Sequence, residues 1–103
     1  MSNYSAEGSE KIISLCKIFS NPSRLKLINL LNERPYHFAE LLKELNVNPK
    51  VLHDGLNLLR NAKLLLKSYP YGVYTLTPLG HKVKGWLDSV DKYIGSVLGE
   101  LNE

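Results

Sequence analysis

The sequence of 103 residues predicts a mainly α-helical fold with a small β-sheet and a long C-terminal helix. In residues 38–61 the apolar positions recur at the three- and four-residue spacings of two short amphipathic helices, with a tight turn between them. Residues 64–77 then read as strand, turn and strand. From Val83 onward, apolar residues recur at alternating spacings of four and three. This order is that of a winged helix-turn-helix followed by a coiled-coil-like helix.

Two helices are expected before the helix-turn-helix. Ser9 is a suitable N-cap for a first helix that runs to about Ser20. Its expected apolar stripe consists of Ile12, Leu15, Cys16 and Phe19. Because a residue before proline avoids the helical region, Asn21 should end this segment, and Pro22 suits the first turn of a second helix that ends near Asn32. The residues expected to face inward from it are Leu25, Ile28 and Leu31.

The helix-turn-helix itself is expected over residues 38–61. Its first helix has an i, i+3, i+4, i+7 apolar face made by Phe38, Leu41, Leu42 and Leu45. After the turn, Asn48 is a good N-cap, and Pro49 occupies the first helical position, where its missing N–H costs nothing. The second helix runs to about Asn61 and faces the core with Leu52, Leu56 and Leu59. Its other side carries Lys50, His53, Asp54, Asn57 and Asn61, with Arg60 on the flank.

Strand formers follow in residues 64–69 and 73–77, separated by Pro70-Tyr71-Gly72, which favours a tight turn. Residues 36–37 are expected to add a short edge strand. Thr77 and Pro78 then form a second N-cap and first-turn pair, so the last helix should run from there almost to the C-terminus.

The last helix carries an apolar seam with heptad spacing, flanked on one side by Trp86 and Tyr93. The seam consists of Val83, Leu87, Val90, Ile94, Val97 and Leu101. A helix of about 24 residues at ~1.5 Å per residue is a rod of about 36 Å, longer than so small a body needs. We therefore expect a homodimer paired through this helix and its flanking aromatic residues. The alternative is that the helix packs back onto its own domain.

Charge is distributed unevenly along the chain, although the net charge is only +3. Residues 11–84 hold twelve Lys and Arg against four acidic residues, whereas residues 85–103 hold one Lys against four. A basic body favours a polyanionic partner, and the second helix of the motif is sized for the major groove of double-stranded DNA. The expected DNA contacts are Asn48, Pro49, Lys50, His53, Asp54, Asn57, Arg60, Lys63, Lys67 and Tyr71, with Arg24, Lys26 and Lys43 as further basic candidates. Residues 1–78 are then the DNA-binding domain and residues 79–103 the dimerisation helix of one compact unit.

Other classes of protein find little support in the sequence. His37, His53 and His81 have no acid at ligand or triad spacing, and no HExxH, GxSxG or phosphate-binding glycine loop occurs, so we expect neither an enzyme nor a cofactor. The single Cys16 gives no CxxC metal site; we expect it to be buried and expect no metal. No apolar run reaches the ~18 residues of a membrane span, and the N-terminus lacks signal-peptide features, which favours a cytoplasmic protein without membrane contact.

Three strings resemble the ArsR-type and related archaeal winged-helix regulators. IFSNPSRLKLINLL at residues 18–31 resembles the turn that leads into their second helix, and AELLKELNVNPKVLHDGLNLLRNAKLL at residues 39–65 resembles their helix-turn-helix. YTLTPLGHKV at residues 74–83 resembles their exit from the wing into the last helix. The resemblance covers about residues 15–85. It implies a DNA-binding transcriptional regulator or a chromatin-like architectural protein, without the paired cysteines of the metal-sensing members.

The same resemblance implies roles for single residues. Lys50 would reach a phosphate or a guanine edge, Asn57 would bond adenine, and His53 would donate to a base or a phosphate. Two departures stand out: Asp54 occupies a position that is basic in many relatives, and the wing tip at residues 69–72 has no Arg or Lys. These departures leave open an alternative, a winged-helix module that binds protein or RNA.

Overall fold

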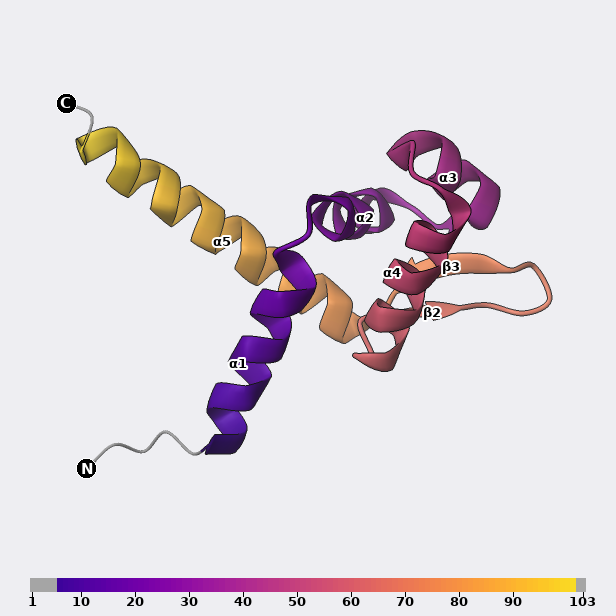
Figure 1. Cartoon of the computed structure of the whole chain (residues 1–103), viewed down its shortest axis with the longest axis horizontal. Helices are drawn as coiled ribbons and strands as arrows, with labels where there is room; N and C mark the ends of the chain where they lie inside the picture. The colour runs from indigo at the N-terminus through magenta and orange to yellow at the C-terminus, as the bar shows by residue number, and fades with distance from the viewer. Residues whose placement is uncertain (1–5, 102–103) are drawn as a thin grey trace.

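The computed structural model describes the backbone of residues 6–101 and the side chains of residues 10–99. Within that part of the chain the elements are α1 (Ala6–Phe19), α2 (Pro22–Glu33), β1 (Tyr36–His37), α3 (Phe38–Leu45), α4 (Pro49–Asn61), β2 (Leu65–Lys67), β3 (Val73–Leu76) and α5 (Pro78–Leu101). This confirms the predicted fold, a mainly helical winged helix-turn-helix with a long C-terminal helix (Figure 1).

The sheet has β3 in the centre, with β1 and β2 antiparallel on either side. Leu65 lies opposite Leu76, and Lys67 lies opposite Tyr74, which sets the register of the hairpin. The two hairpin strands are shorter than predicted because residues 68–72 belong to the turn, where Gly72 has a φ of 68° that suits glycine. The edge strand predicted at residues 36–37 is confirmed.

The core lies where α2, α3 and α4 meet the sheet. The leucine faces predicted for α3 and α4 are confirmed, since Leu41 and Leu45 are buried and Phe38 and Leu42 pack against the same cluster. The most deeply buried side chains are Leu27, Ile28, Leu41, Leu52, Leu56, Leu59 and Leu64. Because three of these leucines come from α4, that helix is held firmly by one face and leaves the other free.

The prediction for α1 was wrong in two respects. The helix begins at Ala6, so Ser9 lies inside it and is not its N-cap. In the predicted stripe, Phe19 is buried and Leu15 packs half-buried against the core. Ile12, however, is 54% exposed, and Cys16 is exposed and not a buried hydrophobe. The physical reason is visible in Figure 1, where α1 projects away from the body toward its N-terminal end.

The break between α1 and α2 is confirmed, but the buried face of α2 differs from the prediction. Asn21 is extended (φ −103°, ψ 122°), and its side chain accepts hydrogen bonds from the backbone N–H of Ser23 at 2.8 Å and of Arg24 at 3.3 Å. Leu27 is buried in place of Leu25, which is 36% exposed. Leu25 instead lines a cleft between α2 and α5.

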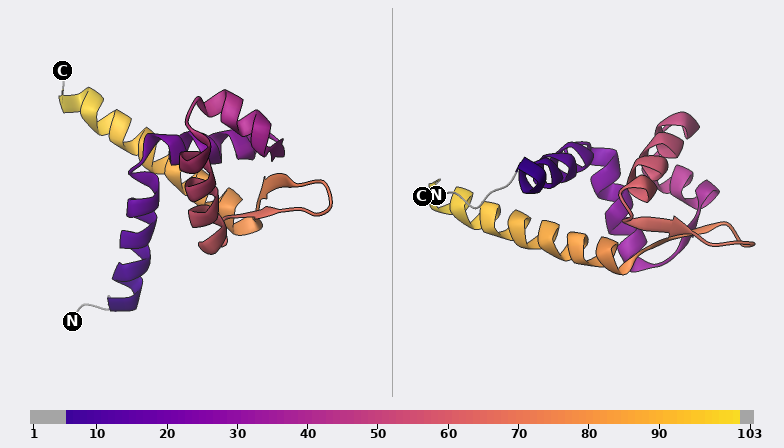
Figure 2. Two further views of the ribbon diagram at one scale, coloured as in Figure 1. Left: turned by 45° about the vertical axis from the view of Figure 1, so that its right-hand side comes forward. Right: turned by 90° about the horizontal axis from the view of Figure 1, so that it is seen from below.

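The long helix α5 starts tightly packed and ends free of the body. Thr77 caps it, because its Oγ1 accepts the N–H of Gly80 at 3.0 Å. Gly80 is required there, since a Cβ at this position would lie 2.0 Å from the carbonyl oxygen of Leu64. Figures 1 and 2 show the second half of α5 leaving the body on the side opposite the hairpin. No helix in residues 6–101 combines the length and apolar character needed to cross a bilayer.

Candidate nucleic-acid interface

The start of α4 is fixed by local polar bonds. Asn46 ends α3 in the left-handed conformation (φ 53°, ψ 48°), which asparagine tolerates well. Asn48 then accepts the backbone N–H of Val51 at 2.9 Å, and Pro49 takes the first helical position, as predicted. The turn between α3 and α4 is thus determined by residues within it.

The outer face of α4 carries the polar residues that the sequence assigned to it. Lys50, His53 and Asp54 have side chains that are 84%, 66% and 61% exposed. Asn57 and Arg60 are half-buried at the edges of the face. Because Leu52, Leu56 and Leu59 anchor the opposite side, this polar face has a defined orientation toward solvent.

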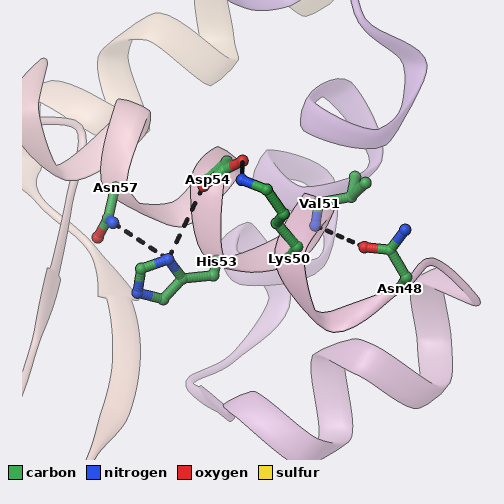
Figure 3. A network of polar contacts seen from close by, with 6 residues as sticks. All are labelled: Asn48, Lys50, Val51, His53, Asp54 and Asn57. Carbon is green, nitrogen blue, oxygen red and sulfur yellow. Dashed lines mark hydrogen bonds and ion pairs between the residues drawn. The ribbon is translucent and has the colours of Figure 1, made fainter.

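Four of these side chains form a continuous line along the helix (Figure 3). The Nζ of Lys50 donates to Oδ2 of Asp54 at 3.2 Å, an i, i+4 pair. The other carboxylate oxygen of Asp54 lies 3.9 Å from Nδ1 of His53, and the same ring nitrogen lies 3.4 Å from Nδ2 of Asn57. Exposed pairs of this kind contribute about 0.2–1 kcal/mol, so they can exchange for a better partner at little cost.

The hairpin presents aromatic side chains rather than a basic tip. Tyr69 and Tyr71 are 74% and 76% exposed. The Nζ of Lys67 lies 5.8 Å from the ring centre of Tyr69 and 5.5 Å from that of Tyr74. Tyr71 is among the DNA contacts predicted from the sequence and Tyr69 is not, although the Tyr-Pro-Tyr string places both tyrosines around the same turn.

Lys63 occupies an unusual backbone position directly after α4. Its φ is 66°, and the N–H of Leu64 donates to the carbonyl of Leu59 at 3.0 Å. This hydrogen bond is typical of a helix C-terminus that ends with a left-handed residue, and that residue is most often glycine. A lysine here places a cation at the C-terminal end of α4, where the helix dipole favours positive charge. Lys63 is exposed, so its ammonium group is accessible to an anionic partner.

Two arginines form contacts within the fold. The Nε of Arg24 donates to the carbonyl of Ile18 at 2.6 Å and thereby ties the start of α2 to the end of α1, while its role as a DNA contact stays a prediction. Arg34 stacks 3.7 Å from the ring centre of Tyr36 and pairs with Glu40 at 3.2 Å. Glu40 also accepts the backbone N–H of His37 at 2.9 Å, and this bond, with Arg34 assisting, lowers the pKa of its carboxyl group below the ordinary value of 4.5.

The seam residues on α5 fall into two groups. Val83 is 8% exposed and belongs to the core of its own chain, and Leu87 packs against that core. The flanking Trp86 and Tyr93 and the seam residue Ile94 are 46%, 70% and 49% exposed. Val90 and Val97 are half-buried, while the side chain of Leu101 lies outside the described side chains.

An apolar cleft connects α5 to α1. It is lined by Ile12, Leu15, Lys82, Val83 and Trp86. Ile12 and Ile13 are more than half exposed, so α1 contributes to the same surface. Ile12 was predicted to face the interior, but the adjacent pair Ile12-Ile13 was a signal that this helix is apolar on more than one side.

The histidines show no arrangement typical of a catalytic or metal centre. On α5, Nδ1 of His81 lies 3.1 Å from Oδ1 of Asn32 on α2 and bridges the two helices. His53 belongs to the polar line on α4. Among the residues that the structure describes, no group of three or more His, Cys, Asp or Glu side chains could hold a metal ion.

Both the sequence and the fold are similar to those of known proteins. The family model of bacterial regulatory proteins of the arsR family matches residues 21–67, from the N-cap of α2 through β2. MJ0361 of Methanocaldococcus jannaschii, described as an uncharacterised HTH-type transcriptional regulator, is 30% identical over 86 residues, covering 77% of this chain and 80% of the relative.

Two solved structures show the same fold. Rv0081 from M. tuberculosis superposes with a TM-score of 0.80 at 21% identity, covering 97% of this chain and 100% of the other. The transcriptional repressor BigR from Xylella fastidiosa superposes with a TM-score of 0.70 at 22% identity, covering 82% and 86%. At identities of 21% and 22%, these structures show that the fold of this chain is similar to theirs.

Proposed function

Since this chain belongs to the arsR-type helix-turn-helix transcriptional regulators, we propose that it binds double-stranded DNA as a homodimer, with α4 in the major groove. Its relatives are regulators and not enzymes, which agrees with the expectation from the sequence. The observation that carries the proposal is the exposed polar face of α4, held outward by three buried leucines on the opposite side.

The DNA contacts divide by chemistry. α4 has 13 residues, which at ~1.5 Å each make about 20 Å, and the major groove admits a single helix of this kind. Lys50, His53 and Asn57 are the candidates for base edges, with Asn48, Pro49 and Asp54 beside them at the start of the helix. The candidates for phosphate contacts are Arg60, Lys63, Lys67 and the hydroxyl group of Tyr71.

The second chain would cover the apolar surface that α1 and α5 leave open. We assign residues 1–78 to DNA binding and residues 79–103 to dimerisation, within one compact unit. Trp86, Tyr93 and Ile94 are the exposed residues of the proposed interface, together with Val90 and Val97, while Val83 and Leu87 contribute mainly by holding α5 to its own body. Two-fold symmetry would set the two copies of α4 about 34 Å apart, one turn of the duplex.

Paired lysine substitutions test the DNA proposal. Lys50→Ala combined with Lys67→Ala should weaken binding to a mixed-sequence duplex of 30 base pairs at low salt by at least about tenfold, because two phosphate or base contacts are removed. Lys17→Ala combined with Lys92→Ala is the charge-matched control, since both lysines are exposed and lie outside α4 and the hairpin. Equal affinities of the double variant and the control would contradict the use of α4 and the hairpin.

One observation favours a second candidate function. Tyr69 and Tyr71 form an exposed aromatic wing tip without a base, a surface that suits stacking on single-stranded RNA or packing against a protein. Under this alternative, Tyr71→Ala would abolish binding to a single-stranded RNA of mixed sequence, while duplex DNA would show no binding at low salt.

A further inference from the structure

The outer face of α4 contains a single acid among basic and amide side chains. Asp54 is 61% exposed, so burial does not explain its presence. Its two oxygens point to two neighbours on the same face: Oδ2 accepts a hydrogen bond from Lys50 at 3.2 Å, and Oδ1 lies 3.9 Å from Nδ1 of His53 (Figure 3). Asp54 therefore compensates the positive charge of Lys50 in the free protein.

A carboxylate in this place is unfavourable next to DNA unless it finds a donor. Phosphate groups repel it, and pairing with Asp54 withdraws Lys50 from the non-specific phosphate attraction that dominates affinity for any duplex. In the major groove, Asp side chains characteristically accept a hydrogen bond from the exocyclic amine of cytosine. The carboxylate of Asp54 thus lowers the affinity for most DNA sequences, and it gains a hydrogen bond only from sequences that place a cytosine amine beside it.

Building on the proposed function, we propose that Asp54 is a specificity-determining residue that selects a cytosine amine in the major groove and suppresses binding to DNA that lacks it. The adjacent Lys50 completes the match. One G·C pair offers the cytosine N4 amine to Asp54 and the guanine O6 and N7 acceptors to Lys50. An A·T pair also offers an amine and an acceptor, but its thymine methyl group would lie against a charged pair.

The hydrogen bond between Lys50 and Asp54 makes this selection reversible. Both side chains are largely exposed, so water and base edges can replace the pair without exposing a buried charge. Nδ1 of His53 lies 3.9 Å from the other carboxylate oxygen of Asp54, so in the free protein the acid lies between Lys50 and His53. A base pair that offers both an amine and an acceptor can therefore replace the hydrogen bond between Lys50 and Asp54 while the two side chains stay close to their positions in the free protein.

The test compares Asp54→Asn with Glu33→Gln. Both variants remove one negative charge from an exposed acid, but Glu33 lies at the end of α2 and outside the polar line on α4. For each protein, affinity is measured for a mixed-sequence duplex of 30 base pairs and for the best duplex recovered by selection from a random pool with the wild-type protein. Circular dichroism checks that both variants remain folded.

Asp54→Asn should bind the mixed-sequence duplex about three- to fivefold more tightly than wild type, because an exposed repulsive charge has been removed. Its ratio of selected to mixed affinity should fall by at least about fivefold. Asp54→Ala, which also removes the acceptor oxygen that asparagine keeps, should select sites that lack the preference at one G·C position. Glu33→Gln should keep the wild-type ratio within about twofold.

Two results would overturn the inference. If Asp54→Asn and Glu33→Gln change both affinities equally, the acid acts only through net charge. If Asp54→Ala, which removes the acceptor oxygen that asparagine would keep, recovers the same preferred sequence as wild type, the side chain of Asp54 reads no base, even though duplex binding stands. Failure of the wild-type protein to bind any duplex at low salt would instead remove the proposed function, and the inference with it.

Discussion

The body of the molecule and its projecting helices use the same apolar periodicity with opposite results. In α4, Leu52, Leu56 and Leu59 are at most 2% exposed, because α2, α3 and the sheet cover them. In α5 a seam of equal regularity is covered only at its start: Val83 is 8% exposed, but Ile94 is 49% exposed. Periodicity therefore predicts that a helix has a face to be covered, while what covers it depends on the rest of the fold or on another chain.

The first prediction compares the two regions through leucine truncation. Leu56→Ala should lower the free energy of unfolding by about 2–5 kcal/mol, since it leaves a cavity in the core. Leu98→Ala, at a position that is 52% exposed on α5, should cost less than about 1 kcal/mol in the monomer. Urea denaturation at a protein concentration where the chain is monomeric measures both. Equal costs would mean that the second half of α5 is packed within its own chain.

Glycine positions on α5 provide the next comparison. Gly80→Ala should destabilise the fold by about 1–3 kcal/mol, because the new Cβ meets the carbonyl of Leu64 and backbone must move. Gly85→Ala, which meets nothing within 4 Å, should instead stabilise the helix by about 0.5–1 kcal/mol. Thermal melts of the two variants check the opposite signs, and a stabilised Gly80→Ala protein would refute the close contact.

A charge placed on the exposed seam tests whether a second chain covers it. Ile94→Asp should convert the proposed dimer into a monomer in light scattering, because burying an unpaired carboxylate is costly. Ser96→Asp introduces the same charge two residues away, off the seam, and should leave the mass unchanged. A dimeric Ile94→Asp protein would exclude this part of α5 from the interface.

Lys63→Gly separates stability from binding at the end of α4. Glycine suits the φ of 66°, so this variant should raise the free energy of unfolding by about 1 kcal/mol. The same change removes a cation and should weaken duplex binding about fivefold, comparable with one phosphate contact. Paired melts and titrations measure the two effects. A variant that gains stability and keeps full affinity would show that Lys63 is not a DNA contact.

The smallest expected effect is a pH dependence at the start of α3. The pKa of Glu40 is lowered in the folded state, mainly by the N–H of His37, so its ionised form stabilises the fold above its unfolded pKa. This contribution should be lost as pH falls below about 4.5, the region of ordinary glutamate titration. Glu40→Gln should flatten the acid limb of the stability profile slightly. An unchanged profile would argue against the contribution.

The features of the fold that could be predicted from the sequence are those set by interactions between residues close together in the chain. The caps at Asn21, Asn48 and Thr77 and the prolines after them act within a few residues, so the boundaries of α2, α4 and α5 could be predicted. The leucine faces of α3 and α4 also followed from spacing.

Other features depend on contacts between distant segments. The bond from Arg24 to the end of α1 requires the angle between two helices, which no local pattern encodes. The exposure of Ile12 and Cys16 depends on α1 projecting from the body, and spacing alone assigned both to the interior. The line from Lys50 through Asp54 to Asn57 lies between these cases: its i, i+4 spacing is local, but its exposure depends on how α4 is anchored.

The most direct test of the account is the affinity of the purified protein for a mixed-sequence duplex of 30 base pairs at two salt concentrations. Binding should tighten at low salt with a steep slope of log affinity against log salt, because phosphate contacts from Lys and Arg release counterions. Absence of binding at low salt, where non-specific affinity should improve on the ~10⁻⁴–10⁻⁶ M typical of physiological salt, would contradict it.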